Sequence, residues 1–115
     1  MPKDQLFLLQ PGFFKESEGP FYCGDSVAVE GLLSFFPQLR NEVDVHYIGA
    51  PRPRAAIVAL IGADNQSAPV LVLGSGRVVS DAGVQTRTHN GVRFIDAPDQ
   101  IRHYLSAQYG VARAS

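Results

Sequence analysis

Two short strand-like segments separated by one helical segment constrain the fold of this chain more than any other feature. The first, Gln5–Leu9, is apolar from Leu6 onward, which is typical of a strand covered on both faces. The second, Val43–Ile48, alternates apolar and polar residues, so it predicts a strand with one more exposed face. Between them, apolar residues at helical spacing predict a helix over Gly24–Phe36, with Val27, Leu33 and Phe36 on its inner face and Phe35 widening that face. Two strands joined through a helix form a right-handed parallel unit.

The second half of the chain predicts another helix, two strands and a closing helix. A helix over Arg54–Ile61 precedes a strand over Ala68–Leu73, and a strand over Val92–Ile95 precedes a helix from about Pro98 to Tyr109. The last two strands have no helix between them, so we expect them to be antiparallel. The order β-α-β-α-β-β-α predicts an α/β fold with a four-stranded mixed sheet flanked by helices on both faces.

Two segments are harder to assign. Residues 12–20 are predicted as a surface loop, in which Phe13 and Phe14 either close over the following cysteine or fill a gap beneath the loop. In residues 77–90, Arg77–Ser80 is either a short strand or irregular chain, and the Asn-Gly pair at its end is a turn signal.

Composition favours one domain over residues 1–115. The net charge of −1 gives no electrostatic reason to expect nucleic acid or an anionic membrane as partner. No apolar run approaches the roughly 20 residues that span a bilayer. One cysteine cannot form an internal disulfide, and the first residues show no signal-peptide pattern, so we expect a cytoplasmic protein.

Cys23 is the one cysteine, and it lies where the first helix is predicted to begin. The helix dipole and the free backbone N–H groups at a helix start stabilise a thiolate, which is the nucleophilic form of cysteine. Ser26, one turn along, is in a position to donate a hydrogen bond to the sulfur, whereas the charge of Asp25 opposes the thiolate. The alternative is an inert buried cysteine. The sequence leaves both interpretations open.

Three segments resemble known thiol proteins. Cys23-Gly-Asp-Ser26 is similar to the Cys-x-x-Ser motif of single-cysteine glutaredoxins, and Ser67–Leu71 resembles the cis-proline segment of the thioredoxin fold. Phe94–Leu105 resembles the closing strand and helix of glutathione transferase N-terminal domains. The chain as a whole resembles the thioredoxin-like superfamily and, most closely, a small bacterial thioredoxin-like family of unknown function.

This resemblance implies a thioredoxin-like fold and a monothiol, glutathione-linked protein in which Cys23 and Ser26 are the catalytic residues. It also implies a cis bond before Pro69, next to which an extended thiol peptide would dock. Glutathione would then be a substrate, and no resident cofactor is expected. The residues implied in binding it are Tyr22, Ala68, Pro69, Asp96 and Ala97.

Several of these residues also have simpler interpretations. Asp96 and Asp99 at the start of the last helix are suited to capping it. Tyr22 either contacts the sulfur or packs under the helix. Arg52 and Arg54 either bind a carboxylate or are solvated.

The departures from the known families limit the reaction. Ser26 replaces a resolving cysteine, so a dithiol cycle within this chain is excluded. Ala97 stands where the transferases usually have a hydroxyl residue. The alternative function is a non-catalytic binding or interaction domain with the same fold, and a third is an iron–sulfur cluster shared by two chains through Cys23. Whether the protein is an enzyme stays open, as does a homodimer, for which the Val43–Ile48 edge is one candidate surface.

The three histidines show no metal-ligand spacing with one another or with the cysteine, so no metal site is predicted.

Overall fold

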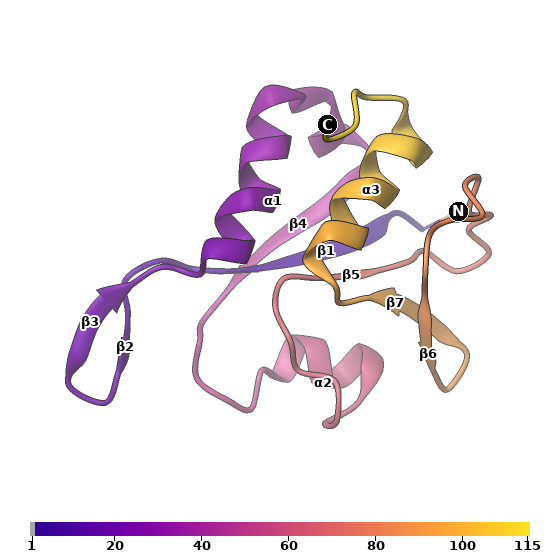
Figure 1. Cartoon of the computed structure of the whole chain (residues 1–115). Helices are drawn as coiled ribbons and strands as arrows, with labels where there is room; N and C mark the ends of the chain where they lie inside the picture. Colours follow the sequence, from indigo (N-terminus) through magenta and orange to yellow (C-terminus); the bar gives the residue numbers. More distant parts are fainter. Residues whose placement is uncertain (1) are drawn as a thin grey trace.

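Five strands form one mixed sheet in the order β4-β1-β5-β7-β6 in the computed structural model, which describes residues 2–115 (Figure 1). The interior strand β1 (Asp4–Leu9) pairs in parallel with β4 (Val43–Ile48) and antiparallel with β5 (Val70–Val72). Strand β7 (Val92–Ile95) pairs antiparallel with β5 and with the edge strand β6 (Arg87–His89). The predicted strand directions are confirmed, but the sheet has five strands rather than four.

The additional strand β6 comes from the segment that the sequence left open. Arg77–Ser80 forms no strand. Instead, β6 and β7 form a hairpin whose turn residues Asn90 and Gly91 have φ values of 48° and 80°. Two consecutive positive φ angles suit a tight hairpin turn, which explains the Asn-Gly pair. The sequence pattern missed β6 because it is only three residues long and largely exposed, so it lacks an apolar signature.

Residues 12–20 also differ from the prediction, because they form a hairpin and not a loop. Strands β2 (Phe13–Lys15) and β3 (Glu18–Phe21) make a separate two-stranded sheet that projects from the body beside the start of the first helix (Figure 1). We call this hairpin the arm. The amide of Gly12 donates to the carbonyl of Phe21 at 2.8 Å and closes its base. Every residue of β3 is exposed, so no alternation of apolar and polar residues marked it.

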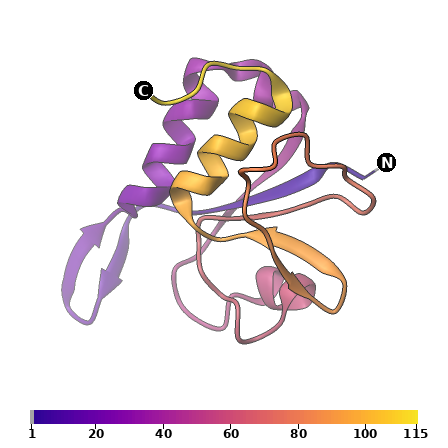
Figure 2. The same cartoon turned by 45° about the vertical axis from the view of Figure 1, so that its right-hand side comes forward.

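The helices cover both faces of the sheet, as predicted (Figure 2). On one face lie α1 (Gly24–Phe35) and α3 (Pro98–Tyr109), and on the other lies α2 (Ala55–Ile61). A short 3-10 helix, η1 (Pro37–Asn41), follows α1, since the proline stops the α-helix before it.

The alternation of side chains along β1 joins the two faces. Leu6 and Leu8 pack with α1 and α3, whereas Phe7 points to the other face and packs with Ile57 of α2. All three β1 side chains are at most 2% exposed, which confirms a strand covered on both faces. Each such buried side chain contributes about 1.5–3 kcal/mol to folding.

The buried face of α1 differs from the prediction. The helical spacing placed Val27 on the inner face, but Val27 is 52% exposed and Phe35 is 84% exposed. The buried residues of α1 are Ser26, Val29 and Leu33. Leu33 is therefore buried as predicted, whereas the buried Ser26, whose hydroxyl accepts from the amide of Leu9, is a polar residue that apolar spacing does not reveal.

A buried carboxylate fixes the start of β1. Asp4 is fully buried, and its Oδ1 accepts from the amide of Gly74 at 2.7 Å and from Nε of Arg77 at 3.1 Å. Its Oδ2 accepts from the hydroxyls of Tyr104 and Tyr109, the latter at 2.7 Å. Burial, helped by the hydrogen bond to Asp4, raises the pKa of Tyr109 to about 12, and the same causes raise the pKa of Tyr104. These contacts join β1, the chain after β5 and α3.

Candidate functional site

Cys23 is the N-cap residue of α1, with φ −83° and ψ 116°. Its sulfur accepts a hydrogen bond from the amide of Ser26 at 3.4 Å. On its other side, Sγ lies 4.0 Å from the carbonyl oxygen of Ala68, to which the thiol donates. Helix α1 therefore begins where the sequence predicted. Ala68, in the segment before β5, lies next to the thiol.

Ser26 has a different contact from the one expected. Its side chain is buried, and its Oγ accepts from the amide of Leu9, the last residue of β1, at 3.1 Å. The backbone amide of Ser26, not its hydroxyl, is the group that donates to the sulfur of Cys23. Ser26 therefore positions the start of α1, and with it the thiol, against the end of β1.

Two clefts meet at Cys23, and both are also lined by Leu9 and Tyr22. The larger, of about 600 Å³, lies between the arm and the chain that follows β4. We call it the arm cleft. The smaller, of about 300 Å³, lies between α1 and β4 and is called the α1–β4 cleft. Tyr22 is 66% exposed, so it forms part of the walls of both clefts and is not packed under the helix.

The arm cleft combines aromatic and basic side chains. Phe13, Phe14 and Phe21 line it from the arm, and Phe14 is 60% exposed. These phenylalanines therefore neither close over the thiol nor fill a gap under a loop. Lys15 belongs to the same lining, with its Nζ 5.6 Å from the ring centroid of Phe21.

Arg54 is the second basic residue of the arm cleft. Its Nε donates to the carbonyl of Ala50 at 3.0 Å, and its Nη1 donates to the carbonyl of Gln66 at 2.7 Å. Burial lowers the pKa of Arg54, and the neighbouring charge of Arg52 acts in the same direction, whereas Cys23 opposes both. The guanidinium is thus held in place by backbone carbonyls near the thiol.

A polar network that no local sequence pattern predicted lies at the α1–β4 cleft, which Glu30 and Tyr47 line. The hydroxyl of Tyr47 donates to Glu30 Oε1 at 2.6 Å and accepts from Arg40 Nη1 at 3.1 Å. Arg40 also forms an ion pair with Glu30. The hydrogen bond to Tyr47 raises the pKa of Arg40 against the opposing effect of burial. These residues are 7 to 17 positions apart, so only the packing of α1 beside β4 brings them together.

Of the remaining predicted residues, Pro69 follows Ala68, which contacts the thiol, whereas Asp96 and Ala97 lie outside the two clefts. Pro69 is buried, and the Ala68–Pro69 peptide bond is cis. Asp96 forms an ion pair of 2.6 Å with Arg87 of β6, and Ala97 is the N-cap residue of α3 without a side-chain capping bond. Asp96 therefore does not cap the helix, and neither Asp96 nor Ala97 lines the two clefts at the thiol.

Residues 2–115 contain neither a candidate metal cluster nor a helix that could span a membrane. Within that range, no three histidine, cysteine, aspartate or glutamate side chains lie close enough together to hold a metal ion. No helix of the same residues combines the length and apolar character required to cross a membrane.

The model of the DUF3088 family, described as a protein of unknown function, matches residues 3–113, so the chain belongs to this family. No curated protein and no solved structure matches the chain. The functional interpretation therefore rests on the geometry around Cys23.

Proposed function

We propose that this DUF3088 protein has a thioredoxin-like fold and that Cys23 is a monothiol nucleophile in glutathione-linked thiol–disulfide exchange. One observation carries the proposal. The sulfur of Cys23 lies at the N-cap of α1, 3.4 Å from the amide of Ser26, where two clefts meet. The amide at the helix start donates to the sulfur, and the two clefts give a substrate access to it.

The sheet supports the fold part of the proposal. Strands β4, β1, β5 and β7 lie in that order, with the first pair parallel and the others antiparallel. Helix α1 connects the parallel pair, and α3 returns to pack on the same face. These four strands support the four-stranded mixed sheet that the resemblance implies. Strand β6 and the arm are additions to it.

The exchange proceeds in two steps that need one protein thiol. The thiolate of Cys23 attacks the glutathione sulfur of a mixed disulfide R–S–S–G, so a new S–S bond forms to Cys23 and R–S⁻ leaves and takes up a proton. The thiolate of a second glutathione then attacks the glutathionyl sulfur, which releases oxidised glutathione and regenerates the Cys23 thiolate. Since the second thiol comes from glutathione, serine at position 26 is compatible with the cycle.

The surroundings of the thiol suit this substrate. The carbonyl of Ala68 is 4.0 Å from the sulfur, where it can accept from the amide of an extended thiol peptide. Lys15 and Arg54 line the arm cleft and supply positive charge for the carboxylates of glutathione.

A second function is favoured by the arm. Phe14, Phe21 and Tyr22 are 60%, 37% and 66% exposed, and exposed aromatic side chains mark interaction surfaces. In that case the protein is a non-catalytic binding domain, and the arm cleft holds a partner's side chains.

Alkylation by iodoacetamide separates the two functions, because every modification reports on the one cysteine. We expect the folded protein to react at neutral pH about tenfold or more faster than the same protein unfolded in urea, since unfolding removes the helix start. Oxidised glutathione should add one glutathionyl group, seen by mass spectrometry, and reduced glutathione should remove it.

The matched control is Cys23→Ser, which should lose both reactions. Alkylation of the folded protein no faster than that of the unfolded protein, with no glutathionyl adduct, would contradict the thiol function and leave the binding domain.

A further inference from the structure

A second groove lies on the opposite side of α1 from the α1–β4 cleft, between α1, α3 and the C-terminal residues. Residues 111–115 turn back from the end of α3 toward α1 (Figures 1 and 2). The groove encloses about 550 Å³, and none of its lining residues lines the clefts at the thiol. It is therefore separate from the proposed thiol site.

One wall of this groove is apolar and open. Ala28, Gly31, Leu32 and Phe35 line it from α1 at a spacing that places them on one side of the helix. Phe35 is 84% exposed, and a Cβ atom on Gly31 would have no atom within 4 Å. The wall is thus an apolar strip that is open at Phe35 and Gly31 and has space in front of it.

The other wall is basic, and its two arginines have no acidic partner. Arg102 of α3 and Arg113 of the tail line the groove, and neither forms an ion pair with any of residues 2–115. The Nε of Arg102 is buried and has no hydrogen-bond partner. A guanidinium carries five N–H donors, so the outer nitrogens of the two arginines can pair with an anionic head group. Asp99 is the acidic side chain among the lining residues.

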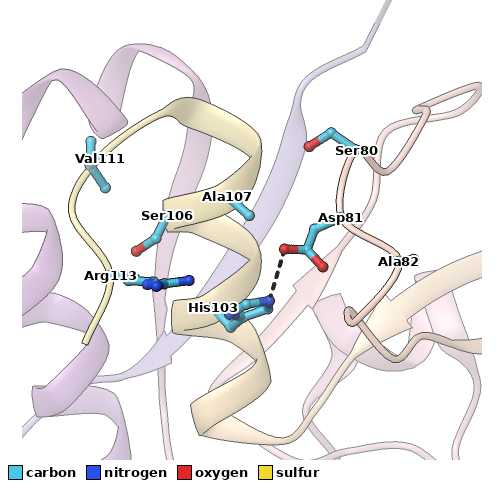
Figure 3. Close-up of a pocket in the computed structure, with 8 residues that line it drawn as sticks. All are labelled: Ser80, Asp81, Ala82, His103, Ser106, Ala107, Val111 and Arg113. Atoms are coloured by element: carbon cyan, nitrogen blue, oxygen red, sulfur yellow. Dashed lines mark ion pairs between the residues drawn. The ribbon is translucent and has the colours of Figure 1, made fainter. Parts of the chain in front are cut away.

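Figure 3 shows the polar cavity that adjoins the groove, of about 520 Å³, in which the guanidinium of Arg113 lies beside His103 and Ser106. These three residues line both cavities. The Nε2 of His103 is 3.3 Å from Oδ2 of Asp81, and the hydroxyl of Ser106 donates to the carbonyl of Ala112 at 3.0 Å. Asp81 and His103 therefore satisfy each other, and Arg113 stays available to a ligand.

We propose that this groove binds an anionic amphiphile, a small molecule with one carboxylate or sulfonate head and an apolar body. The head would pair with Arg102 and Arg113, and the body would lie along the apolar strip of α1. A second copy of this chain is a poorer occupant, because a symmetric contact would bring the same arginines of both copies together. A purely apolar partner would leave the charges of Arg102 and Arg113 without an acidic partner.

Decanoate tests the proposal, with decan-1-ol as its uncharged counterpart and the fluorescent sulfonate 8-anilinonaphthalene-1-sulfonate as a displaceable probe. Calorimetry should show one decanoate per chain, and decanoate should displace the probe. Decan-1-ol should bind about tenfold or more weakly, because it lacks the charge that pairs with arginine.

Two variants locate the binding. Gly31→Leu places a side chain in the groove at a position where an added Cβ has no protein atom within 4 Å, and leucine favours a helix over glycine by about 1 kcal/mol, so the variant should fold. It should abolish decanoate binding, whereas Ser34→Leu, at an exposed α1 position outside the groove, should bind as the parent protein does. Arg102→Met should weaken decanoate about tenfold and leave decan-1-ol unchanged.

Several results would overturn the proposal. These are no binding of decanoate, equal binding by the Gly31→Leu variant, or equal loss of decanoate and decan-1-ol in Arg102→Met. Sedimentation that shows a dimer for the parent and a monomer for Gly31→Leu would assign the groove to a second copy instead. Cys23→Ser should bind decanoate normally, so failure of the thiol function does not affect this result.

Discussion

The polar groups at the two ends of β1 differ in how fully their hydrogen-bonding capacity is used. At its start, Asp4 is fully buried and accepts from four donors. At its end, Leu9 adjoins Cys23, whose sulfur has one amide donor and one distant carbonyl and borders two clefts. Saturated polar groups stabilise a fold, and groups with unused bonding capacity beside a cleft are available to a ligand. The difference therefore separates the end of β1 that stabilises the fold from the end beside the proposed nucleophile.

The largest expected effect is at the saturated end. Asp4→Asn replaces one acceptor oxygen by a donor that faces other donors, so we expect a loss of about 3–5 kcal/mol in the free energy of unfolding. Urea denaturation measures it. Asp64→Asn, at an exposed position, is the control and should be neutral. A loss at position 4 as small as that of the control would remove the distinction between the two ends.

Tyr109→Phe tests the same cluster through its pH dependence. Removing one hydrogen bond to a charged group should cost about 2 kcal/mol at neutral pH. Because the pKa of Tyr109 is raised from 10.0 to about 12 by folding, its contribution is complete below pH 10 and is lost as the pH rises toward 12. The parent should therefore lose stability more steeply above pH 10 than the variant.

Urea midpoints at neutral pH and at about pH 11 check this prediction. Tyr22→Phe, at an exposed tyrosine, should leave the alkaline loss unchanged. An identical alkaline loss in Tyr109→Phe would show that Tyr109 does not contribute to it.

Ser26→Ala probes the connection between the two ends. It removes the acceptor of the Leu9 amide and should cost about 1 kcal/mol. Ser34→Ala, at an exposed position of the same helix, corrects for the higher helix propensity of alanine. Alkylation of Cys23 should be retained, because the backbone amide of residue 26 still donates to the sulfur; complete loss of alkylation would assign the hydroxyl a direct role.

The smallest effect on stability is expected at Cys23, the proposed nucleophile. Serine is a preferred N-cap residue, so Cys23→Ser should change the free energy of unfolding by less than about 0.5 kcal/mol. Urea denaturation of Cys23→Ser and of the parent protein measures this change. A large loss of stability would place Cys23 with the structural residues instead.

The sequence predicted the elements whose residues carry their own signal. The apolar β1, the helix from Gly24 and the closing strand and helix lie within one or two residues of their predicted bounds. The arm and β6 were missed because they are short and exposed. Cys23 stood out as a lone cysteine at a helix start.

The contacts of the site depended on long-range packing that local patterns do not contain. Ser26 and Leu9 are 17 positions apart, and Cys23 and Ala68 are 45 apart. Asp4 is 100 positions from Tyr104, and nothing in either local sequence predicts that they meet. The predicted inner face of α1 was wrong in part for the same reason, since it did not include the buried Ser26.

The closed base of the arm has a consequence for how this scaffold can diversify. The chain enters the arm at Gly12 and leaves it at Phe21 on the way to α1, and one backbone hydrogen bond of 2.8 Å joins these two residues. Insertions, deletions or substitutions between them can reshape one wall of the arm cleft while the anchoring of Cys23 by α1 is inherited unchanged. The arm is thus a replaceable module, and selectivity can evolve there independently of the thiol.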